Sequence, residues 1–252
     1  MSFDVAAESY DRFMGRYSTR LAPLFADFAG VRAGQAVVDV GCGPGALTGE
    51  LVGRLGADHV AAVDPSPPFV EAARSRHPGV DVRQAPAEEL PFADDAFDAA
   101  LAQLVVHFMR DPVAGLTEMA RVVRAGGVVA ACVWDFAGGT APLSRFWSSA
   151  RDLDPGIEDE SHLAGAREGH LVQLFEAAGL RAIEAGELVV RLEHPTFDEW
   201  WEPFTRGVGP AGAHVQRLDP DRREALRELC RQDLGDGPFT VTARAWAARG
   251  TA

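Results

Sequence analysis

The chain has few cysteines and no long apolar run. Its three cysteines, Cys42, Cys132 and Cys230, lie far apart and form no CxxC pair. This spacing fits neither a disulfide framework nor a metal site, so we predict buried thiols and no metal. No apolar run approaches the roughly 18–20 residues that span a bilayer. Residues 1–18 lack the basic start, apolar stretch and cleavage site of a secretory signal, which indicates a cytoplasmic protein.

Basic side chains are also scarce. The chain has 24 Lys and Arg against 37 Asp and Glu, a formal net charge of −13. Proteins that bind nucleic acids neutralise phosphates with clustered basic side chains, and the sequence contains no such cluster. An anionic membrane surface is disfavoured for the same reason. The charge therefore predicts that neither a nucleic acid nor a membrane is a partner.

The first half of the chain has the rhythm of an α/β protein. With 252 residues, 47% hydrophobic and 24% charged, it is long enough for one large domain. Short apolar runs alternate with amphipathic segments, which is typical of βαβ units on a parallel sheet. The predicted strands are 36–40, 60–64, 80–84, 97–103 and 127–134, and the predicted helices between them are 46–55, 67–76 and 113–123.

The rhythm changes after residue 135. The pattern predicts helices at 143–153, 168–178, 196–206 and 219–234, strands at 180–192 and 239–247, and a loop at 207–212. No internal repeat or low-complexity linker separates the two halves. We therefore expect one domain with insertions.

The strongest motif is VVDVGCGPG, residues 37–45. A strand runs into Gly41, Gly43 and Gly45, and a helix follows. Glycines allow the chain to turn sharply and bring its backbone close to a ligand. The amides of the loop and the start of the helix then offer hydrogen-bond donors to that ligand.

Nicotinamide enzymes use a similar turn, but three details favour S-adenosylmethionine. Asp39 lies two residues before the first glycine, and the spacing is GxGxG with Pro44 inside it, rather than GxGxxG. Asp64 ends the second predicted strand about 19 residues after Gly45. A carboxylate at that place can accept hydrogen bonds from both ribose hydroxyls of a cofactor.

These segments resemble class I S-adenosylmethionine-dependent methyltransferases, in the small-molecule branch of ubiquinone and menaquinone methyltransferases. The resemblance covers about residues 35–135 and rests on VVDVGCGPG (37–45), AVDPSPPFVEAAR (62–74), APAEELPFADDAFD (85–98), LVVHFMRDP (104–112) and MARVVRAGG (119–127). It implies an α/β, Rossmann-like, doubly wound sheet of seven strands, mostly parallel with an antiparallel last strand, and a helical cap.

The resemblance also implies a division of the chain and a set of cofactor contacts. It implies a helical lid at 1–30, a cofactor-binding core at 35–135 and a cap insertion at 194–238, all within a single domain of residues 1–252. The implied contacts are Asp39, Gly41, Cys42, Gly43, Asp64, Pro65, Ala87, Glu88 and Gln103. Many relatives carry Asp where this chain has Pro86, so the hydrogen bond to adenine is expected from Glu88 or from a backbone carbonyl.

Two residues are candidates for chemistry because they follow strands whose ends face the ligand crevice. His107 follows the fourth predicted strand, and its ordinary pKa suits proton abstraction; a structural histidine is the alternative. Asp135 follows the fifth strand and is either an orienting carboxylate or a turn residue. Trp134, beside it, is expected to stack on the acceptor.

Aromatic residues also gather in the two segments outside the core. Tyr10 and Tyr17 are the chain's only tyrosines, and either could bind the cofactor or simply pack on the domain. The cap segment is expected to line an acceptor pocket and to exclude water. Its candidate residues are Trp200, Trp201 and Phe204, with His194 and His214 as secondary bases.

The sequence thus predicts methyl transfer from S-adenosylmethionine to carbon, oxygen or nitrogen of a small acceptor, with release of S-adenosylhomocysteine. Three alternatives stay open: a nicotinamide-dependent oxidoreductase, a protein that binds S-adenosylmethionine without transferring a methyl group, and a methyltransferase acting on protein or nucleic acid. The oligomeric state is left open.

Overall fold

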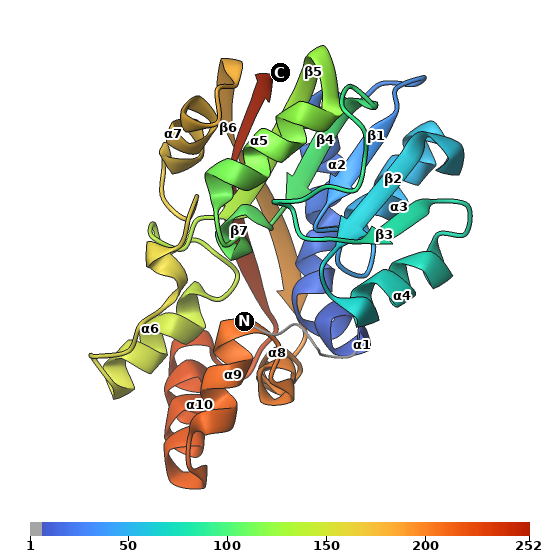
Figure 1. Cartoon of the computed structure of the whole chain (residues 1–252). Helices are drawn as coiled ribbons and strands as arrows, with labels where there is room; N and C mark the ends of the chain where they lie inside the picture. Colours follow the sequence, from blue (N-terminus) through green and yellow to red (C-terminus); the bar gives the residue numbers. More distant parts are fainter. Residues whose placement is uncertain (1–6) are drawn as a thin grey trace.

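The computed structural model describes residues 7–252 and contains one seven-stranded sheet (Figure 1). Its strands are β1 (Val37–Val40), β2 (Val60–Asp64), β3 (Asp81–Gln84), β4 (Phe97–Gln103), β5 (Val123–Trp134), β6 (Arg181–His194) and β7 (Phe239–Thr251). They lie in the order β3-β2-β1-β4-β5-β7-β6. Strand β7 runs antiparallel to both of its neighbours, β5 and β6, and all other neighbouring strands are parallel, which confirms the expected Rossmann-like sheet.

Helices cover both faces of the sheet. They are α1 (Ala7–Tyr10), a π-helical turn η1 (Asp11–Gly15), α2 (Arg16–Ala29), α3 (Ala46–Leu55), α4 (Pro67–Arg76), α5 (Pro112–Val122), α6 (Ser144–Leu153) and α7 (His170–Ala177). Single 3₁₀ turns occur at η2 (Ala57–His59), η3 (Val106–Phe108) and η4 (Glu160–His162). Every residue of β1 and β2 is buried, as expected of parallel strands covered on both sides.

Alternate side chains of the central strands β1 and β4 enter two separate cores. Val37 and Leu101 pack with α2 and α3 on one face. Val38 and Ala100 pack with α5 and α7 on the other. Successive side chains of a strand point to opposite faces, so a continuous apolar run supplies both cores at once.

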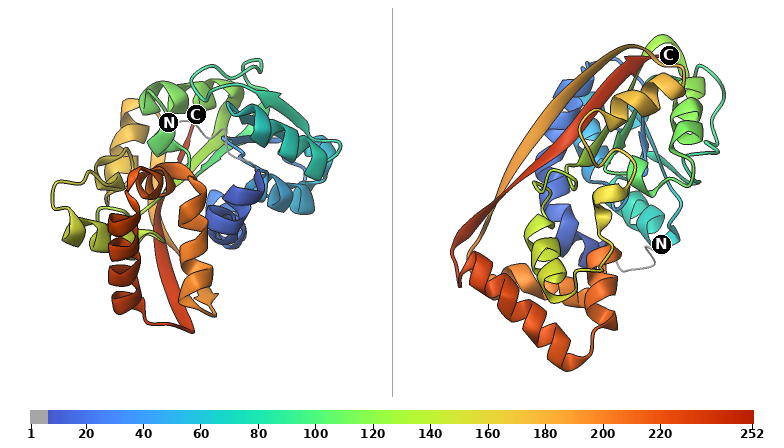
Figure 2. Two further views of the ribbon diagram at one scale, coloured as in Figure 1. Left: turned by 90° about the horizontal axis from the view of Figure 1, so that it is seen from below. Right: turned by 90° about the vertical axis from the view of Figure 1, so that its left-hand side faces the viewer.

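Strands β6 and β7 are unusually long, and they connect the sheet to a helical cap (Figure 2). Their pairing continues to His194 opposite Phe239. The cap, residues 194–238, holds α8 (Phe197–Trp201), η5 (Glu202–Arg206), α9 (Gly209–Arg217) and α10 (Pro220–Leu234). Helix α6 packs against α10, so the chain after β5 also contributes to this part of the molecule.

Two expectations for the cap region were wrong. The glycine-rich segment 207–212 was predicted to be a loop, but α9 begins at Gly209. Gly207, with φ of 76°, ends η5, and Pro210 then stands in the first turn of α9, where its missing N–H is tolerated. Strand β7 also runs to Thr251 rather than to residue 247, because it pairs with both β5 and β6. Within residues 7–252, no helix is long and apolar enough to cross a membrane.

The two-sided core predicts a large difference between two leucines. Leu101 is completely buried in the middle of β4, whereas Leu24 on α2 is 39% exposed. We expect Leu101→Ala to lower the free energy of unfolding by about 2–5 kcal/mol, because it removes a packed side chain and leaves a cavity. Leu24→Ala should change it by less than about 0.5 kcal/mol. Urea denaturation measures both, and equal losses would contradict this account of the core.

Candidate active site

The glycine loop after β1 is held by the end of β2. The amides of Gly41 and Cys42 both donate to the carbonyl of Val63, at 2.8 and 2.9 Å. Gly41 has φ of 73°, and a Cβ there would overlap the side chain of Val105. A Cβ on Gly43 would meet nothing within 4 Å, so the backbone is open to a ligand at this point.

Asp64 joins the loop to β2. Its Oδ2 accepts from the amide of Gly43 at 2.9 Å, and its Oδ1 accepts from the amide of Ser66 at 2.8 Å. Burial raises the pKa of the Asp64 carboxyl, and these two amide hydrogen bonds partly oppose that rise. The carboxylate therefore lies beside the loop, fixed by two amides, as a cofactor-binding residue there requires.

Asp39 contributes a buried oxygen at the end of β1. Thr48 donates to its Oδ2 at 2.7 Å, while Oδ1 is buried without a partner among the described residues. Burial raises the pKa of Asp39 to about 7. Cys42 beside it is buried, with its Sγ 3.4 Å from the carbonyl of Gly43, and Pro65 is exposed. An unpartnered buried oxygen is uncommon, and a polar ligand group would satisfy it.

Gln103 and Glu88 have contacts that the motifs did not indicate. The Nε2 of Gln103 donates to the carbonyl of Ser18 on α2 at 3.1 Å, and its buried Oε1 has no partner within residues 7–252. The Oε1 of Glu88 accepts from the amides of Arg110 and Asp111, at 2.7 and 3.2 Å, at the start of α5. Glu88 thus holds the neighbouring turn with this oxygen, and Ala87 beside it is buried.

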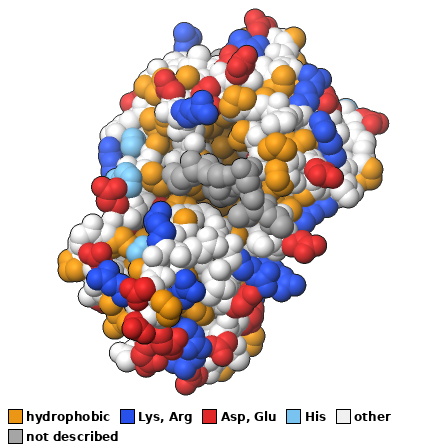
Figure 3. All heavy atoms as spheres, turned by 60° about the horizontal axis from the view of Figure 1, so that its bottom comes forward, with side chains coloured by type: hydrophobic (Ala, Val, Ile, Leu, Met, Phe, Trp, Pro, Cys, Tyr) orange, Lys and Arg blue, Asp and Glu red, His pale blue; other side chains and the backbone are white. Residues whose placement is uncertain are grey.

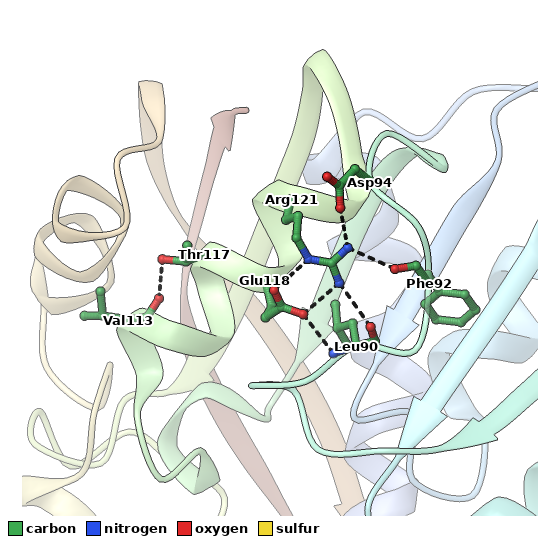
Figure 4. Close-up of polar contacts among 7 residues, drawn as sticks. All are labelled: Leu90, Phe92, Asp94, Val113, Thr117, Glu118 and Arg121. Atoms are coloured by element: carbon green, nitrogen blue, oxygen red, sulfur yellow. Dashed lines mark hydrogen bonds and ion pairs between the residues drawn. The ribbon is translucent and has the colours of Figure 1, made fainter.

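The loop carrying Ala87 and Glu88 is clamped to α5 by one arginine (Figure 4). Arg121 donates to the carbonyls of Leu90 and Phe92, to Asp94, and to both carboxylate oxygens of Glu118. The amide of Leu90 in turn donates to Glu118 at 3.0 Å. Hydrogen bonds from Arg121 lower the pKa of Glu118, against the effect of burial. The planar guanidinium has several N–H donors in fixed directions, which suits a loop with several carbonyl acceptors. All 24 basic residues of this chain are arginines, so Arg121 is typical of its basic side chains.

The N-terminal segment, residues 7–29, connects the cofactor-binding half of the sheet to the cap. Asp11 pairs with Arg76 of α4 at 2.5 Å, and Arg76 also donates to the carbonyl of Pro44 in the glycine loop. At the other end, the hydroxyl of Tyr17 lies 2.9 Å from Nε2 of His194.

Tyr10 lies nearer the cofactor loop than Tyr17 does. Its ring meets Phe69 of α4 edge-on at 5.4 Å, and its hydroxyl lies 3.5 Å from Oγ of Ser18. Burial raises the pKa of Tyr10, and the charge of Asp64 contributes to the rise. Residues 1–6 of the expected lid lie outside the described residues.

An apolar cavity of about 40 Å³ lies between the sheet, the N-terminal segment and the cap. His107 and Trp134, which follow and end neighbouring strands, both line it. Nδ1 of His107 and Nε1 of Trp134 are buried without partners in the described part of the chain. The apolar wall consists of Tyr10, Phe13, Met14, Leu104, Phe108, Phe136, Leu143 and Val208.

Glu160 also lines this cavity, although no sequence motif predicts it there. It belongs to the turn η4, in a stretch without periodicity or motif. Its side chain is buried, and Trp147 donates to its Oε2 at 2.8 Å. Burial raises the pKa of Glu160 to about 7, whereas burial lowers the pKa of His107 to about 3. At neutral pH, Glu160 is therefore the stronger proton acceptor of the two.

The proposed pocket residues of the cap divide into two groups. Trp200, Phe204 and His194 line a smaller cavity of about 10 Å³ beside Tyr17. Trp201 and His214 line neither of these two cavities. Trp201 stacks on Phe204 at 5.8 Å, and His214 lies 6.0 Å from the ring of Trp147, so both pack within the cap.

Asp135 has the surroundings of a structural residue. Its Oδ1 accepts from the amide of Gly138 and from Nε1 of Trp246, and its Oδ2 accepts from Thr140 and Arg244. Although burial alone would raise its pKa, the hydrogen bonds from Thr140 and Arg244 lower the pKa of Asp135. A carboxylate occupied by four donors has little capacity to take a proton from an acceptor. Of the two readings from the sequence, the structure favours the turn residue over the catalytic one.

Comparison with known proteins shows what the central part of the chain is similar to. Residues 38–131 match the family model described as "Methyltransferase domain". The chain is 33% identical to 2-methyl-6-phytyl-1,4-hydroquinone methyltransferase 2, chloroplastic, of Oryza sativa subsp. japonica, over 59% of this chain and 39% of the relative. It is 34% identical to malonyl (acyl-carrier protein) O-methyltransferase of Erwinia billingiae, over 51% of this chain and 50% of the relative. The chain thus spans half or less of these curated relatives.

The fold has solved counterparts. The crystal structure of the YcgJ protein from Bacillus subtilis superposes with a TM-score of 0.59 at 21% identity, covering 94% of this chain and 98% of that one. The match of residues 38–131 to the methyltransferase domain model confirms the resemblance drawn from the motifs. S-adenosylmethionine is the methyl donor of this class.

The four donors around Asp135 give a stability prediction. We expect Asp135→Ala to lower the free energy of unfolding by about 3 kcal/mol, because it leaves buried N–H groups and Arg244 without their acceptor. The matched control is Asp94→Ala, which removes an exposed partner of Arg121 and should cost less than about 1 kcal/mol. Thermal and urea unfolding measure both. A loss no larger for Asp135 than for Asp94 would return Asp135 to the list of catalytic candidates.

Proposed function

We propose that this chain transfers a methyl group from S-adenosylmethionine to a small, largely apolar acceptor and releases S-adenosylhomocysteine. One observation carries this most directly: the apolar cavity lies at the same edge of the sheet as the glycine loop. Strand β4, which leads into His107, pairs with both β1 and β5, so the loop after β1 and Trp134 at the end of β5 flank it. In open α/β sheets, ligands bind at this edge.

The residues at the strand ends fit the cofactor's chemistry. The open backbone at Gly43 and the carboxylate of Asp64 suit a ribose, and the free Oδ1 of Asp39 suits the positively charged amino group of the methionine part. The free Oε1 of Gln103 is a further acceptor nearby. When bound, the cofactor supplies an already activated methyl group. The protein then mainly has to orient the acceptor and take up its proton.

The N-terminal segment and the cap are proposed to close over the site. The ion pair of Arg76 with Asp11 and the contact of Tyr17 with His194 attach one segment to both sides of the crevice. Arg16 forms a further ion pair with Glu199 of the cap. Hydrophobic side chains border the hollow between the two parts of the molecule, and charged side chains lie mostly farther out (Figure 3). Closure of this kind excludes water from the transfer.

The relatives' names favour methyl transfer over cofactor binding without transfer. The hydroquinone methyltransferase is named for a small molecule with an apolar tail, which agrees with the apolar cavity. A small-molecule acceptor is accordingly proposed for this chain. The cytoplasmic location and the exclusion of nucleic acid and membrane as partners stay predictions from the sequence.

The first experiment is calorimetric titration with S-adenosylmethionine, S-adenosylhomocysteine and NAD in parallel. We expect binding of both sulfur ligands and none of NAD. Asp64→Ala should weaken S-adenosylhomocysteine binding by about 1–3 kcal/mol, because ribose hydroxyls lose a charged acceptor. Asp81→Ala, which removes an exposed carboxylate from the next strand, is the matched control and should bind as the unmodified chain does. Equal affinities in the two variants would remove Asp64 from the cofactor site.

Closure gives a separate prediction for Tyr17. Tyr17→Phe keeps the ring but removes the hydroxyl that meets His194, so the N-terminal segment should open more often. Hydrogen exchange of residues 16–29 should rise about fivefold or more, since a buried hydrogen bond contributes about 1 kcal/mol. Thr19→Val, which removes a hydroxyl that donates to the carbonyl of Gly15 one turn earlier in the same segment, is the control. Unchanged exchange in Tyr17→Phe would show that this contact does not hold the segment.

A further inference from the structure

Besides the ring nitrogens of His107 and Trp134, the cavity beside His107 contains a carboxyl group with an unused bonding position. Glu160 is 4% exposed and lines the cavity, and its Oε2 is taken by the indole N–H of Trp147. Its Oε1 has no hydrogen-bond partner among the described residues. Burying a carboxylate without full hydrogen bonding is costly, so such a group in a cavity is the expected mark of a ligand contact.

Neighbouring residues hold this carboxyl in place. Asp159 caps η4 by accepting from the amide of Ser161 at 2.9 Å, and Arg151 of α6 forms an ion pair with Asp159. Trp147 lies on the same helix, α6, as Arg151. The turn is thus anchored at two points, and the direction of the Glu160 carboxyl is fixed before any ligand binds.

The side chains in the rest of the cavity wall indicate which kind of chemical group the ligand would place against them. Its aromatic side chains include Phe13, Phe108, Trp134 and Phe136. Rings of this kind pack edge-on or offset against another aromatic ring. The present volume of about 40 Å³ is smaller than the roughly 150 Å³ of a cavity that holds benzene. A ring therefore enters only when Tyr10–Met14 and Val208–Pro210, which form separate walls, move apart.

We propose, building on the proposed function, that Glu160 is the acceptor-binding base and that the acceptor is a phenol, methylated on oxygen. The hydroxyl donates to Oε1 of Glu160, while the aromatic ring lies in the apolar wall. In the transfer, the phenol oxygen forms a bond to the methyl carbon and its proton passes to Glu160. The carbon–sulfur bond of S-adenosylmethionine breaks, and the sulfur keeps the electron pair. His107 lines the wall and is not the base.

The test uses phenol and toluene, which have nearly the same shape but differ in the hydroxyl group. Both are titrated into the full chain at pH 8 with saturating S-adenosylhomocysteine. We expect phenol to bind at least tenfold more tightly than toluene. In Glu160→Gln, the preference should fall below threefold. Trp147 continues to donate to the amide oxygen, so the amide NH₂ takes the place of Oε1, and a weaker neutral hydrogen bond to the phenol oxygen replaces the one that the hydroxyl donated to the carboxylate.

The matched control is Glu158→Gln, which changes an exposed carboxylate two residues earlier and should keep the full preference for phenol. Equal affinity of all three proteins for S-adenosylhomocysteine shows that they are folded. If the unmodified chain fails to bind S-adenosylhomocysteine, the proposed function is overturned. If it binds that ligand but not phenol, or if Glu160→Gln keeps the tenfold preference, the assignment of Glu160 is overturned and the proposed function stands.

A pH titration tests the same assignment without a variant. Because burial raises the pKa of Glu160 to about 7, its carboxylate form predominates above pH 7 and is lost below it. The preference for phenol should therefore be complete at pH 8 and nearly absent at pH 5.5. The other ionisable groups nearby are Asp159, with Arg151 and His162 beside it, Tyr10 and His107 across the cavity, and His214 beyond Trp147. A preference that is the same at both pH values would contradict the assignment.

Discussion

The turn after β1 depends on a carbonyl and a carboxylate supplied by the neighbouring strand. Val63 accepts from two successive amides of the turn, and Asp64 accepts from a third. A residue with a Cβ at position 41 would overlap the side chain of Val105 in this turn. The loop is therefore shaped by β2 and by the turn after β4 as well as by its own glycines. Because β1, β2 and β4 run parallel, their polar carboxyl ends lie at one edge of the sheet.

A second constraint acts on the opposite side of the crevice, where aromatic rings join three segments far apart in the chain. Phe204 of the cap stacks on Phe146 at 4.6 Å and meets Phe13 edge-on at 4.9 Å. Polar atoms enclosed by such packing must find partners. The hydroxyl of Tyr17 pairs with Nε2 of His194, and the indole N–H of Trp147 donates to Glu160. The unpartnered ring nitrogens of His107 and Trp134 lie at the cavity that also contains the carboxyl group of Glu160.

The core of the sheet could be predicted because its signals are local. Strands β1, β2 and β4 are continuous apolar runs, and the glycine spacing marks the turn without knowledge of its neighbours. Helix α9 was missed because its glycines and proline favour a loop when considered alone; packing within the cap decides otherwise. The role of Asp135 could not be decided from the sequence for a related reason. Its place after a strand left a catalytic role open, but Arg244 and Trp246, more than a hundred residues later, donate hydrogen bonds to its carboxylate.

By itself, the sequence determined the class of fold and the cofactor loop, since glycine positions and strand periodicity are properties of neighbouring residues. It also determined that the cap would be rich in aromatic side chains. Only the tertiary structure decided which polar groups remain free. Glu160 carries no sequence signal, because its raised pKa and its open oxygen arise from the residues that bury it and from the one donor that reaches it. Burial and hydrogen-bond partners depend on residues far apart in the sequence. They set the pKa of a carboxyl group and so decide whether it can act as a base or has a structural role.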